Sequence, residues 1–258
     1  MSRTRANLVG LYTIVYKELN RVLRIWVQTL VPPAITMTLY FIIFGQLIGR
    51  RIGEMGGLDF MAFIAPGLIM MSIIQNSYGN VVSSFFGAKF GRHIEEMMVS
   101  PLPNSLILLG YVVGGMGRGL LVGLLVALVA AFFTDLQLHN IWVLVPVVLL
   151  TSAVFSLAGL INAVYAKKFD DISIIPTFVL TPLTYLGGVF YTVDLLPGVF
   201  RELSLFNPIL YMVSAFRYSI HGVTDVSIAL AFAIIIGFLV SLYVFALWLL
   251  TRGIGLRS

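Results

Sequence analysis

The sequence predicts an all-α integral membrane protein that crosses the bilayer six times. Six long apolar stretches, separated by short polar breaks, lie at residues 25–49, 60–86, 104–133, 141–166, 172–193 and 226–251. Each has about the 20 residues that a helix needs to cross the hydrocarbon core. The stretches are continuously apolar, without the alternation typical of membrane barrel strands. Finally, 59% of the residues are hydrophobic and 10% are charged, whereas a soluble domain carries about 25% charged residues.

The composition also limits the domain organisation and the partners. We divide the chain into a cytoplasmic tail with an interfacial helix (1–24) and one six-helix transmembrane domain (25–258). The first apolar stretch is too long for a signal peptide and lacks a small-residue cleavage site, so we expect it to be retained.

The chain has no cysteine, which excludes disulfides and thiolate metal sites. The net charge of +5 is explained by Lys and Arg that meet anionic lipids, so we predict lipid partners and no nucleic acid.

The distribution of Lys and Arg predicts that both termini are cytoplasmic. With the N-terminus inside, 11 of the 16 Lys and Arg residues lie in cytoplasmic segments, four lie outside and Arg118 lies within a span. The cytoplasmic residues are Arg3, Arg5, Lys17, Arg21, Arg24, Lys89, Arg92, Lys167, Lys168, Arg252 and Arg257. The outside residues are Arg50, Arg51, Arg201 and Arg217.

An amphipathic helix is expected at residues 7–24, before the first crossing. One face carries apolar residues at helical spacing, and the other carries Lys17, Arg21 and Arg24. This pattern is typical of a helix that lies in the membrane interface. Two interpretations stay open: a basic anchor that sets topology, and an elbow helix that also contacts a cytoplasmic partner.

The loop between the second and third spans predicts a short surface helix. Arg92, Glu95 and Glu96 lie beside Met97 and other apolar residues, and Pro101 and Pro103 end the segment. A charged helix that carries Met suits docking into a groove on another protein. The alternative is a loop that only reverses the chain. The second inside loop contains Lys168, Asp170 and Asp171, and it is either a minor docking contact or a tight turn.

Two features inside the apolar stretches stand out. Arg118 lies within the third span, where an ionisable residue is by default a candidate for function. It either lines a polar path, pairs with another helix, or snorkels to the cytoplasmic interface. Gly115, Gly119 and Gly123 form a small-residue stripe that permits close helix packing, more often within one subunit than across a dimer.

The fifth stretch is interrupted by prolines and glycines, and the segment that follows it (191–222) is too punctuated to cross the membrane. We interpret this segment as short helices that dip into the outer leaflet. Such helices gate a pathway or simply pack as a lid.

No residue pattern indicates catalysis. The chain has no phosphate-loop motif, and His93, His139 and His221 are far apart in the sequence. We therefore predict no catalytic residue, no metal ligands and no cofactor in this chain.

A family resemblance lies in residues 180–217. They read LTPLTYLGGVFYTVDLLPGVFRELSLFNPILYMVSAFR, and this spacing resembles the signature of the type-2 ATP-binding-cassette (ABC) permeases, the membrane subunits of bacterial exporters. The matching positions are Leu180, Leu183, Leu186, Gly187, Val189, Leu196, Pro197, Pro208, Ile209, Tyr211 and Arg217. The elbow helix, the six crossings and the acidic first loop are similar to the family as well.

The resemblance implies an efflux permease in a bacterial inner membrane that forms a homodimer and binds two copies of a separate ATPase, which holds ATP and Mg²⁺. Residues expected to couple to that ATPase are Arg92, Glu95, Glu96, Met97, Pro101, Lys168, Asp170 and Asp171. Residues expected in the pathway or its outer gate are Arg118, Phe190, Tyr191, Pro197, Pro208, Tyr211 and Arg217. The family motifs do not distinguish substrates, but an apolar path with one arginine hints at an amphiphile with a negative group.

Two other function classes fit the sequence less well. A secondary transporter driven by an ion gradient would carry acidic residues in the spans and an inverted repeat, and neither is visible. A membrane scaffold without transport would need a large docking surface, whereas the cytoplasmic segments are small.

Overall fold

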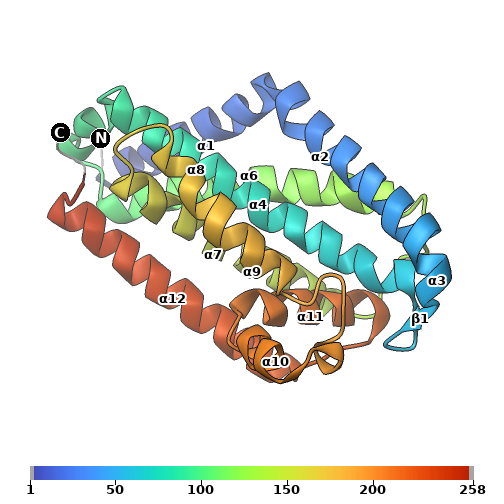
Figure 1. Cartoon of the computed structure of the whole chain (residues 1–258). Coiled ribbons are helices and arrows are strands. Elements are labelled where there is room, and N and C mark those ends of the chain that lie inside the picture. Colours follow the sequence, from blue (N-terminus) through green and yellow to red (C-terminus); the bar gives the residue numbers. More distant parts are fainter. Residues whose placement is uncertain (1–2, 256–258) are drawn as a thin grey trace.

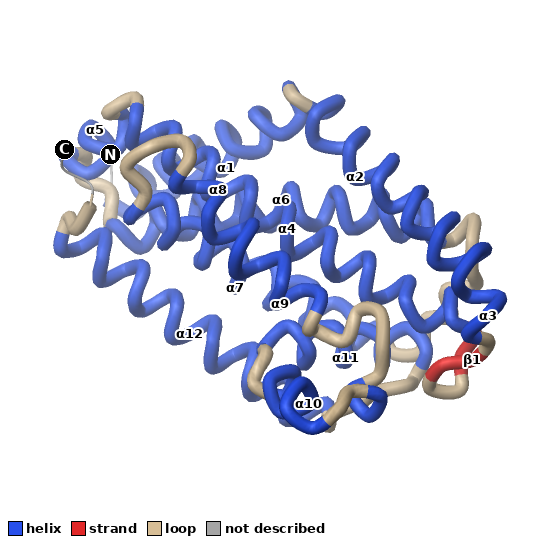
Figure 2. The backbone as a smooth tube through the Cα atoms, in the orientation of Figure 1, coloured by secondary structure: helices blue, strands red, loops and turns tan. Residues whose placement is uncertain are grey.

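The computed structural model describes residues 3–255, and most of them are helical (Figures 1 and 2). Arg257 and the side chain of Arg50, both used in the charge count, lie outside the described part. The helices are α1 (Arg3–Arg24), α2 (Trp26–Tyr40), π-helical η1 (Phe41–Gly49), α3 (Arg50–Ile52), α4 (Phe60–Phe90), α5 (His93–Val99), α6 (Asn104–Ala130), α7 (Ile141–Tyr165), α8 (Asp171–Ile175), π-helical η2 (Pro176–Leu180), α9 (Thr181–Tyr185), the 3₁₀ turn η3 (Val193–Leu195), α10 (Gly198–Leu205), α11 (Pro208–His221) and α12 (Ile228–Arg252). Strands β1 (Glu54–Met55) and β2 (Leu58–Asp59) form a small antiparallel hairpin.

The prediction of a helical protein with several membrane spans is confirmed. Within residues 3–255, five helices are long and apolar enough to cross a bilayer. They are Trp26–Gly45, Phe60–Phe90, Asn104–Ala130, Ile141–Tyr165 and Ile228–Arg252. Each of them overlaps one of the apolar stretches identified in the sequence.

The fifth predicted stretch forms a shorter helix than expected. Segments α8, η2 and α9 follow one another as five residues each and end at Tyr185, a length of roughly 22 Å at 1.5 Å per residue. The hydrocarbon core is about 30 Å thick, so this run does not span it alone. The chain then turns at Gly188, whose φ of +69° favours glycine.

Helix α4 is the centre of the bundle. In its most apolar window 83% of the residues are buried inside the protein, compared with 11% for α12, so α12 is the helix that leaves most of its surface for lipid. Helices α6 and α7 approach α4 closely through glycine. A Cβ atom on Gly119 would collide with Ser77 of α4, and one on Gly159 would collide with the backbone of Tyr78. The predicted small-residue stripe therefore packs within the chain.

Helices α1 and α2 form a bent arm along α6, with the bend at Ile25 (Figure 1). The predicted amphipathic helix is present as α1. Only Ile14, Glu18 and Val22 of α1 are buried, and these three residues follow each other at i+4 spacing. Much of the wider apolar face is left for lipid, because Leu8 and Tyr12 are 62% and 68% exposed.

The two ends of the bundle carry different elements. Both termini and α5 lie at one end, whereas the β-hairpin, α10 and α11 lie at the other (Figures 1 and 2). The segment α8–η2–α9 runs between the two ends and packs only lightly on α4 and α7.

Candidate functional site

One side of α4 is polar and faces open space, although the rest of this helix is buried. Five residues share this side, the α4 stripe: Gln75, Asn76, Gly79, Ser83 and Gly87. They follow one another at helical spacing, and all five are partly or fully accessible. A Cβ atom on Gly79 or Gly87 would meet no atom within 4 Å. In a membrane span, polar side chains beside open space are typical of a water-lined path.

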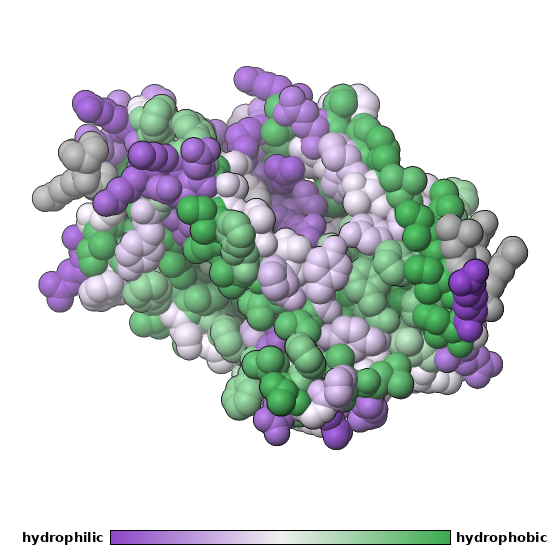
Figure 3. Space-filling model, in the orientation of Figure 1, coloured by the Kyte–Doolittle hydropathy of each residue, from purple (hydrophilic) through white to green (hydrophobic). Residues whose placement is uncertain are grey.

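The hollow in front of this helix is visible on the surface. Figure 3 shows hydrophilic residues in a hollow between the α1–α2 arm and the α8–α9 segment. Sequence reasoning missed the α4 stripe because the second stretch was read only for its length. The signal was present, since Gln75, Asn76 and Ser83 lie on one helical face within an otherwise apolar stretch.

A charged cluster borders the α4 stripe where α1 meets α4 and α6. We call Glu18, Arg21, Asn80, Ser84 and Arg118 the elbow cluster. The carboxylate of Glu18 is fully buried and accepts a hydrogen bond from Ser84 Oγ at 2.6 Å. Arg21 Nη2 donates to Asn80 Oδ1 at 2.7 Å and to the Asn80 carbonyl at 3.0 Å, and it lies 3.7 Å from Glu18 Oε2. These contacts fasten α1 to α4, the central helix of the bundle.

Arg118 lies in the same region but has no such partners. The three ion pairs found among residues 3–255 involve Arg21, Arg201 and Arg217, and none includes Arg118. Its side chain is half-buried, and its buried Nε atom has no hydrogen-bond acceptor within the described part of the chain. The sequence leaves three roles open for Arg118. The described structure does not support one of them, a pairing with another helix.

Four aromatic rings connect α2 with α9 toward the other end of the hollow. This aromatic cluster consists of Tyr40, Phe44, Tyr185 and Phe190. The rings of Phe44 and Phe190 are 5.0 Å apart, those of Tyr185 and Phe190 are 5.8 Å apart, and the hydroxyls of Tyr40 and Tyr185 are 3.2 Å apart. Only Phe190 was singled out from the sequence. The two tyrosines are 145 positions apart, so no local pattern indicates their contact.

Arg217 is buried completely and joins four parts of the chain. Its Nη1 atom pairs with Asp225 Oδ2 at 3.1 Å, Nε donates to the Phe63 carbonyl at 3.2 Å, and Nη2 donates to the Gly188 carbonyl at 2.5 Å. The guanidinium also lies 3.8 Å from the centre of the Phe63 ring. Burial raises the pKa of Asp225, and the charge of Arg217 only partly offsets this shift. Arg217 therefore holds the fold together and does not line the hollow.

The other expected gate residues belong to the short helices that cover this end. Pro197 precedes α10, Pro208 opens α11, and the hydroxyl of Tyr211 donates to the Leu205 carbonyl at 2.8 Å. Tyr191 is half-buried, and its hydroxyl has no partner among the described residues. Ser204 Oγ and Asn207 Nδ2 donate to the carbonyls of Leu186 and Leu183. These two bonds tie α10 and α11 to the end of α9.

At the opposite end, the two segments expected to couple to an ATPase lie next to each other. Phe169 of the second loop packs on Phe90, which precedes α5, with ring centres 4.9 Å apart. Lys89 Nζ donates to the carbonyls of Val164 and Ala166 at 2.6 and 2.7 Å. We call the combined surface of α5 and residues 166–171 the α5–loop surface.

The α5–loop surface presents charged side chains on a short, anchored helix. Ile94 is buried and anchors α5, Arg92 has a left-handed φ of 61°, and Glu95 and Glu96 are exposed. Exposed on the same surface are Pro101, Lys168, Phe169 and Asp170, with Met97 half-buried. Asp171 Oδ2 accepts the backbone N–H groups of Lys167 and Lys168 at 2.8 and 3.0 Å, and these bonds lower the pKa of Asp171.

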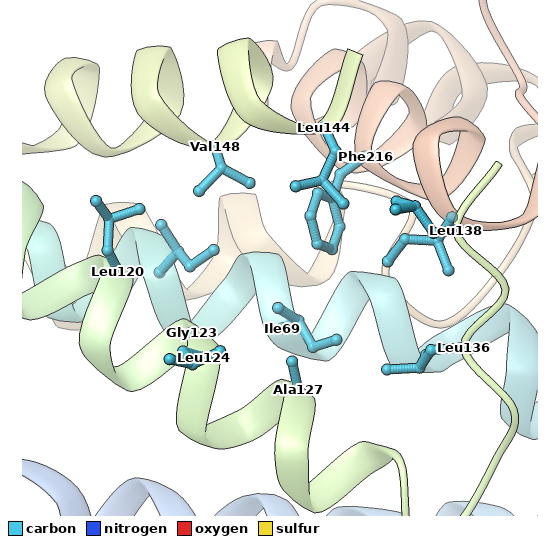
Figure 4. A pocket seen from close by; sticks show the side chains of 12 residues that line it. Ile69, Leu120, Gly123, Leu124, Ala127, Leu136, Leu138, Leu144, Val148 and Phe216 are labelled. Carbon is cyan, nitrogen blue, oxygen red and sulfur yellow. The ribbon is translucent and has the colours of Figure 1, made fainter. Parts of the chain in front are cut away.

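An apolar pocket of about 330 Å³ lies apart from these sites, between α4, α6, α7 and α11. Figure 4 shows that aliphatic side chains and Phe216 surround it. The lining residues are Ile69, Ile73, Leu120, Gly123, Leu124, Ala127, Leu136, Leu138, Leu144, Val148, Phe216 and Ile220. It has no polar side chain to orient a ligand. Among residues 3–255, no group of three or more His, Asp or Glu side chains is placed to hold a metal ion.

Comparison with known proteins identifies related chains. The model of the family described as "ABC-2 type transporter" matches residues 10–221. "Inner membrane transport permease YadH" of Escherichia coli (strain K12) is 59% identical over 251 residues, which cover 97% of this chain and 98% of that protein. "Nodulation protein J" of Rhizobium leguminosarum bv. trifolii is 28% identical over 191 residues, which cover 73% of each protein.

Proposed function

The chain belongs to the ABC-2 type transporter family, and from that premise we propose that two copies of it form the substrate path of an ATP-driven exporter. Family membership makes it a multi-pass inner-membrane permease subunit that works with an ATPase partner. The observation that carries the proposal is the α4 stripe, a polar face of the central helix that lines a hollow. The export direction and the homodimer are parts of the proposal.

The proposed topology has six crossings, with both termini in the cytoplasm. The fifth crossing would consist of α8–η2–α9, completed by the segment after Tyr185. Helices α10 and α11 would re-enter the outer leaflet as a cap. The charge distribution supports this orientation, because the end that holds α5 and the termini also holds most of the Lys and Arg residues.

A second copy would close the open side of the hollow. Helix α2 and the α8–α9 segment border the hollow and expose large apolar residues, with Trp26 56%, Ile35 57% and Phe178 74% exposed. Apolar surface next to a polar hollow suits a protein partner better than lipid, since lipid tails cannot satisfy the polar α4 stripe. We therefore place the dimer contact along α2 and α8–α9, with the two α4 stripes facing a shared path.

Energy would enter through the α5–loop surface. ATP and Mg²⁺ would bind in the two ATPase copies, and this chain would supply no nucleotide ligand. ATP acts only by stabilising one arrangement of the ATPase pair more than the other. Movement of α5 would pass to α4, since only two residues separate these helices. The aromatic cluster would form the outer closure, because its rings bridge the two segments that border the hollow.

Mass spectrometry of the complex purified from native membranes in mild detergent tests the proposal. We expect a stoichiometric ATPase with the wild-type chain and at least about tenfold less of it with the Glu95→Ala/Glu96→Ala variant, because removing charged contacts costs roughly 1.5–3 kcal/mol each. Glu202→Ala changes an exposed acid at the other end of the bundle and is the matched control. Absence of an ATPase from the wild-type complex would refute the exporter.

A further inference from the structure

We propose that Arg21, Asn80 and Arg118 form a binding site for the phosphate group of an acidic amphiphile at the inner mouth of the hollow. The inference rests on the proposed function only in treating the occupant as cargo, and it names the chemical class of that cargo. The site itself stands on the geometry of the elbow cluster.

The first observation is the unsatisfied charge of Arg118. Its half-buried guanidinium has no acid within ion-pair distance among the described residues, and its Nε atom has no acceptor. The positive charge of Arg21 is near enough to repel it. A buried charge without a partner is unfavourable unless an opposite charge arrives. The site therefore favours an anion.

The second observation is that hydrogen-bond donors remain free beside it. Arg21 Nη2 uses Asn80 Oδ1 as its acceptor, so this contact leaves the amide nitrogen of Asn80 unused. Asn80 is fully buried, and its Nδ2 atom has no partner within residues 3–255; the Nε atom of Arg21 has none either. Three free donors, on Arg21, Asn80 and Arg118, match a group with several acceptor oxygens, such as phosphate.

The third observation concerns the acid in the cluster. Glu18 accepts from Ser84 through Oε1, and its Oε2 lies 3.7 Å from Arg21 Nη2 without a hydrogen bond. The cluster therefore contains one carboxylate and two guanidinium groups. The cluster keeps an excess positive charge even after this ion pair is counted, so an arriving anion is attracted.

The fourth observation is the position of the cluster on the path. Arg21 Nη2 and Ser83 Oγ donate to the same acceptor, the backbone carbonyl of Asn80. Because Ser83 belongs to the α4 stripe, the cationic site opens onto the hollow. Helix α1 is amphipathic, and the proposed topology places such a helix at headgroup depth. A ligand bound there would place its anionic group in the cluster and its hydrocarbon in the adjacent membrane, which indicates an amphiphile.

Native mass spectrometry of the full chain, delipidated in a neutral detergent, tests the site. The probes are dioleoyl phosphatidic acid, dioleoylglycerol with the same tails and no phosphate, and free inorganic phosphate. We expect the wild-type chain to bind phosphatidic acid at least about tenfold more tightly than Arg118→Gln does. Loss of one hydrogen bond between charged groups lowers the affinity by about a factor of ten. Arg24→Gln removes an exposed arginine from α1, the helix that carries Arg21, and should bind as the wild type does.

A conservative variant and a competition experiment complete the test. Arg118→Lys retains the charge and should bind more tightly than Arg118→Gln, which shows that a loss is not caused by misfolding. Competition by inorganic phosphate would show that the headgroup alone is recognised, and lack of competition would show that the acyl chains are also needed; both outcomes keep the site. Equal binding by Arg118→Gln and wild type, or equal binding of dioleoylglycerol, would overturn it. No ATPase takes part in this experiment. The phosphate site can therefore be refuted even if the ATPase co-purifies with the chain, and it can hold even if no ATPase co-purifies.

Discussion

Arg118 and Arg217 are two arginines of the same membrane protein with opposite surroundings. Every nitrogen of the Arg217 guanidinium has a partner, and Asp225 balances its charge. Arg118 is half-buried with no acid beside it among residues 3–255. Arg217 connects α11, α4 and two connecting segments, whereas Arg118 faces another cation. A buried arginine that is fully paired is part of the architecture, and one that is left unpaired points to a ligand.

Among the variants that test this comparison, Arg217→Ala should give the largest loss of unfolding free energy. It leaves Asp225, which is largely buried, without a counterion and frees two backbone carbonyls, so we expect a loss of about 3–5 kcal/mol in unfolding free energy. Thermal unfolding of the purified chain in detergent measures this loss. Arg201→Ala is the control, since its pair with Asp194 is largely exposed and should contribute about 0.5 kcal/mol. Similar losses for the two variants would contradict the structural role of Arg217.

Asp225→Asn tests the other half of the same pair. It keeps the shape and removes the charge, so Arg217 retains its carbonyl acceptors and loses its counterion. We expect a smaller loss, about 1.5–3 kcal/mol, typical of a hydrogen bond to a charged group. The measurement is again thermal unfolding, and the double variant with Arg217→Ala should show that the two effects are not additive. Additive losses would mean that Asp225 and Arg217 act independently.

Arg118→Gln should change the unfolding free energy by less than about 1 kcal/mol, because Arg118 has no ion pair or hydrogen bond to lose among residues 3–255. Removing an uncompensated cation even favours a slight gain in unfolding free energy. The same purified variant used for lipid binding serves for this measurement. A loss of 3 kcal/mol or more would show that Arg118 is structural like Arg217, and the contrast between the two arginines would disappear.

The smallest effect is expected for Asp171→Asn, a charged residue at the surface. Its carboxylate accepts the N–H groups of Lys167 and Lys168, which lowers its pKa. The stabilisation from this ionised group is therefore present above its usual pKa and is lost only as the pH falls through the lowered value. We expect only a small loss of unfolding free energy at pH 7, because water screens a carboxylate at the surface. It should not vary between pH 6 and 8 in thermal unfolding scans, and variation there would contradict the pKa assignment.

Much of the helical layout was predictable from local patterns. Five of the six apolar stretches correspond to spans, and the amphipathic helix and α5 lie where the sequence places them. Apolar length and helical periodicity are properties of neighbouring residues, so they can be read from the sequence. The fifth stretch is not confirmed as a span, because its helix ends at Tyr185, where the chain turns through Gly187 and Gly188 to meet α10 and α11.

The candidate sites were predictable only in part. Arg118, Phe190 and the two inside loops were recognised from residue type and position. The α4 stripe was missed, because only the packing of α6 and α7 shows which face of α4 stays open. The contact between Tyr40 and Tyr185 was missed because 145 positions separate them.

By itself the sequence determined that the chain lies in a membrane, where its helices begin and how its charges are distributed. These features follow from the solvent, since a lipid core accepts apolar helices and excludes charge. The tertiary structure decided which of two arginines is satisfied and which polar face of the central helix stays open. Both depend on groups far apart in the sequence, and only the packing of whole helices brings an acid to Arg217 and leaves none beside Arg118 in the described structure.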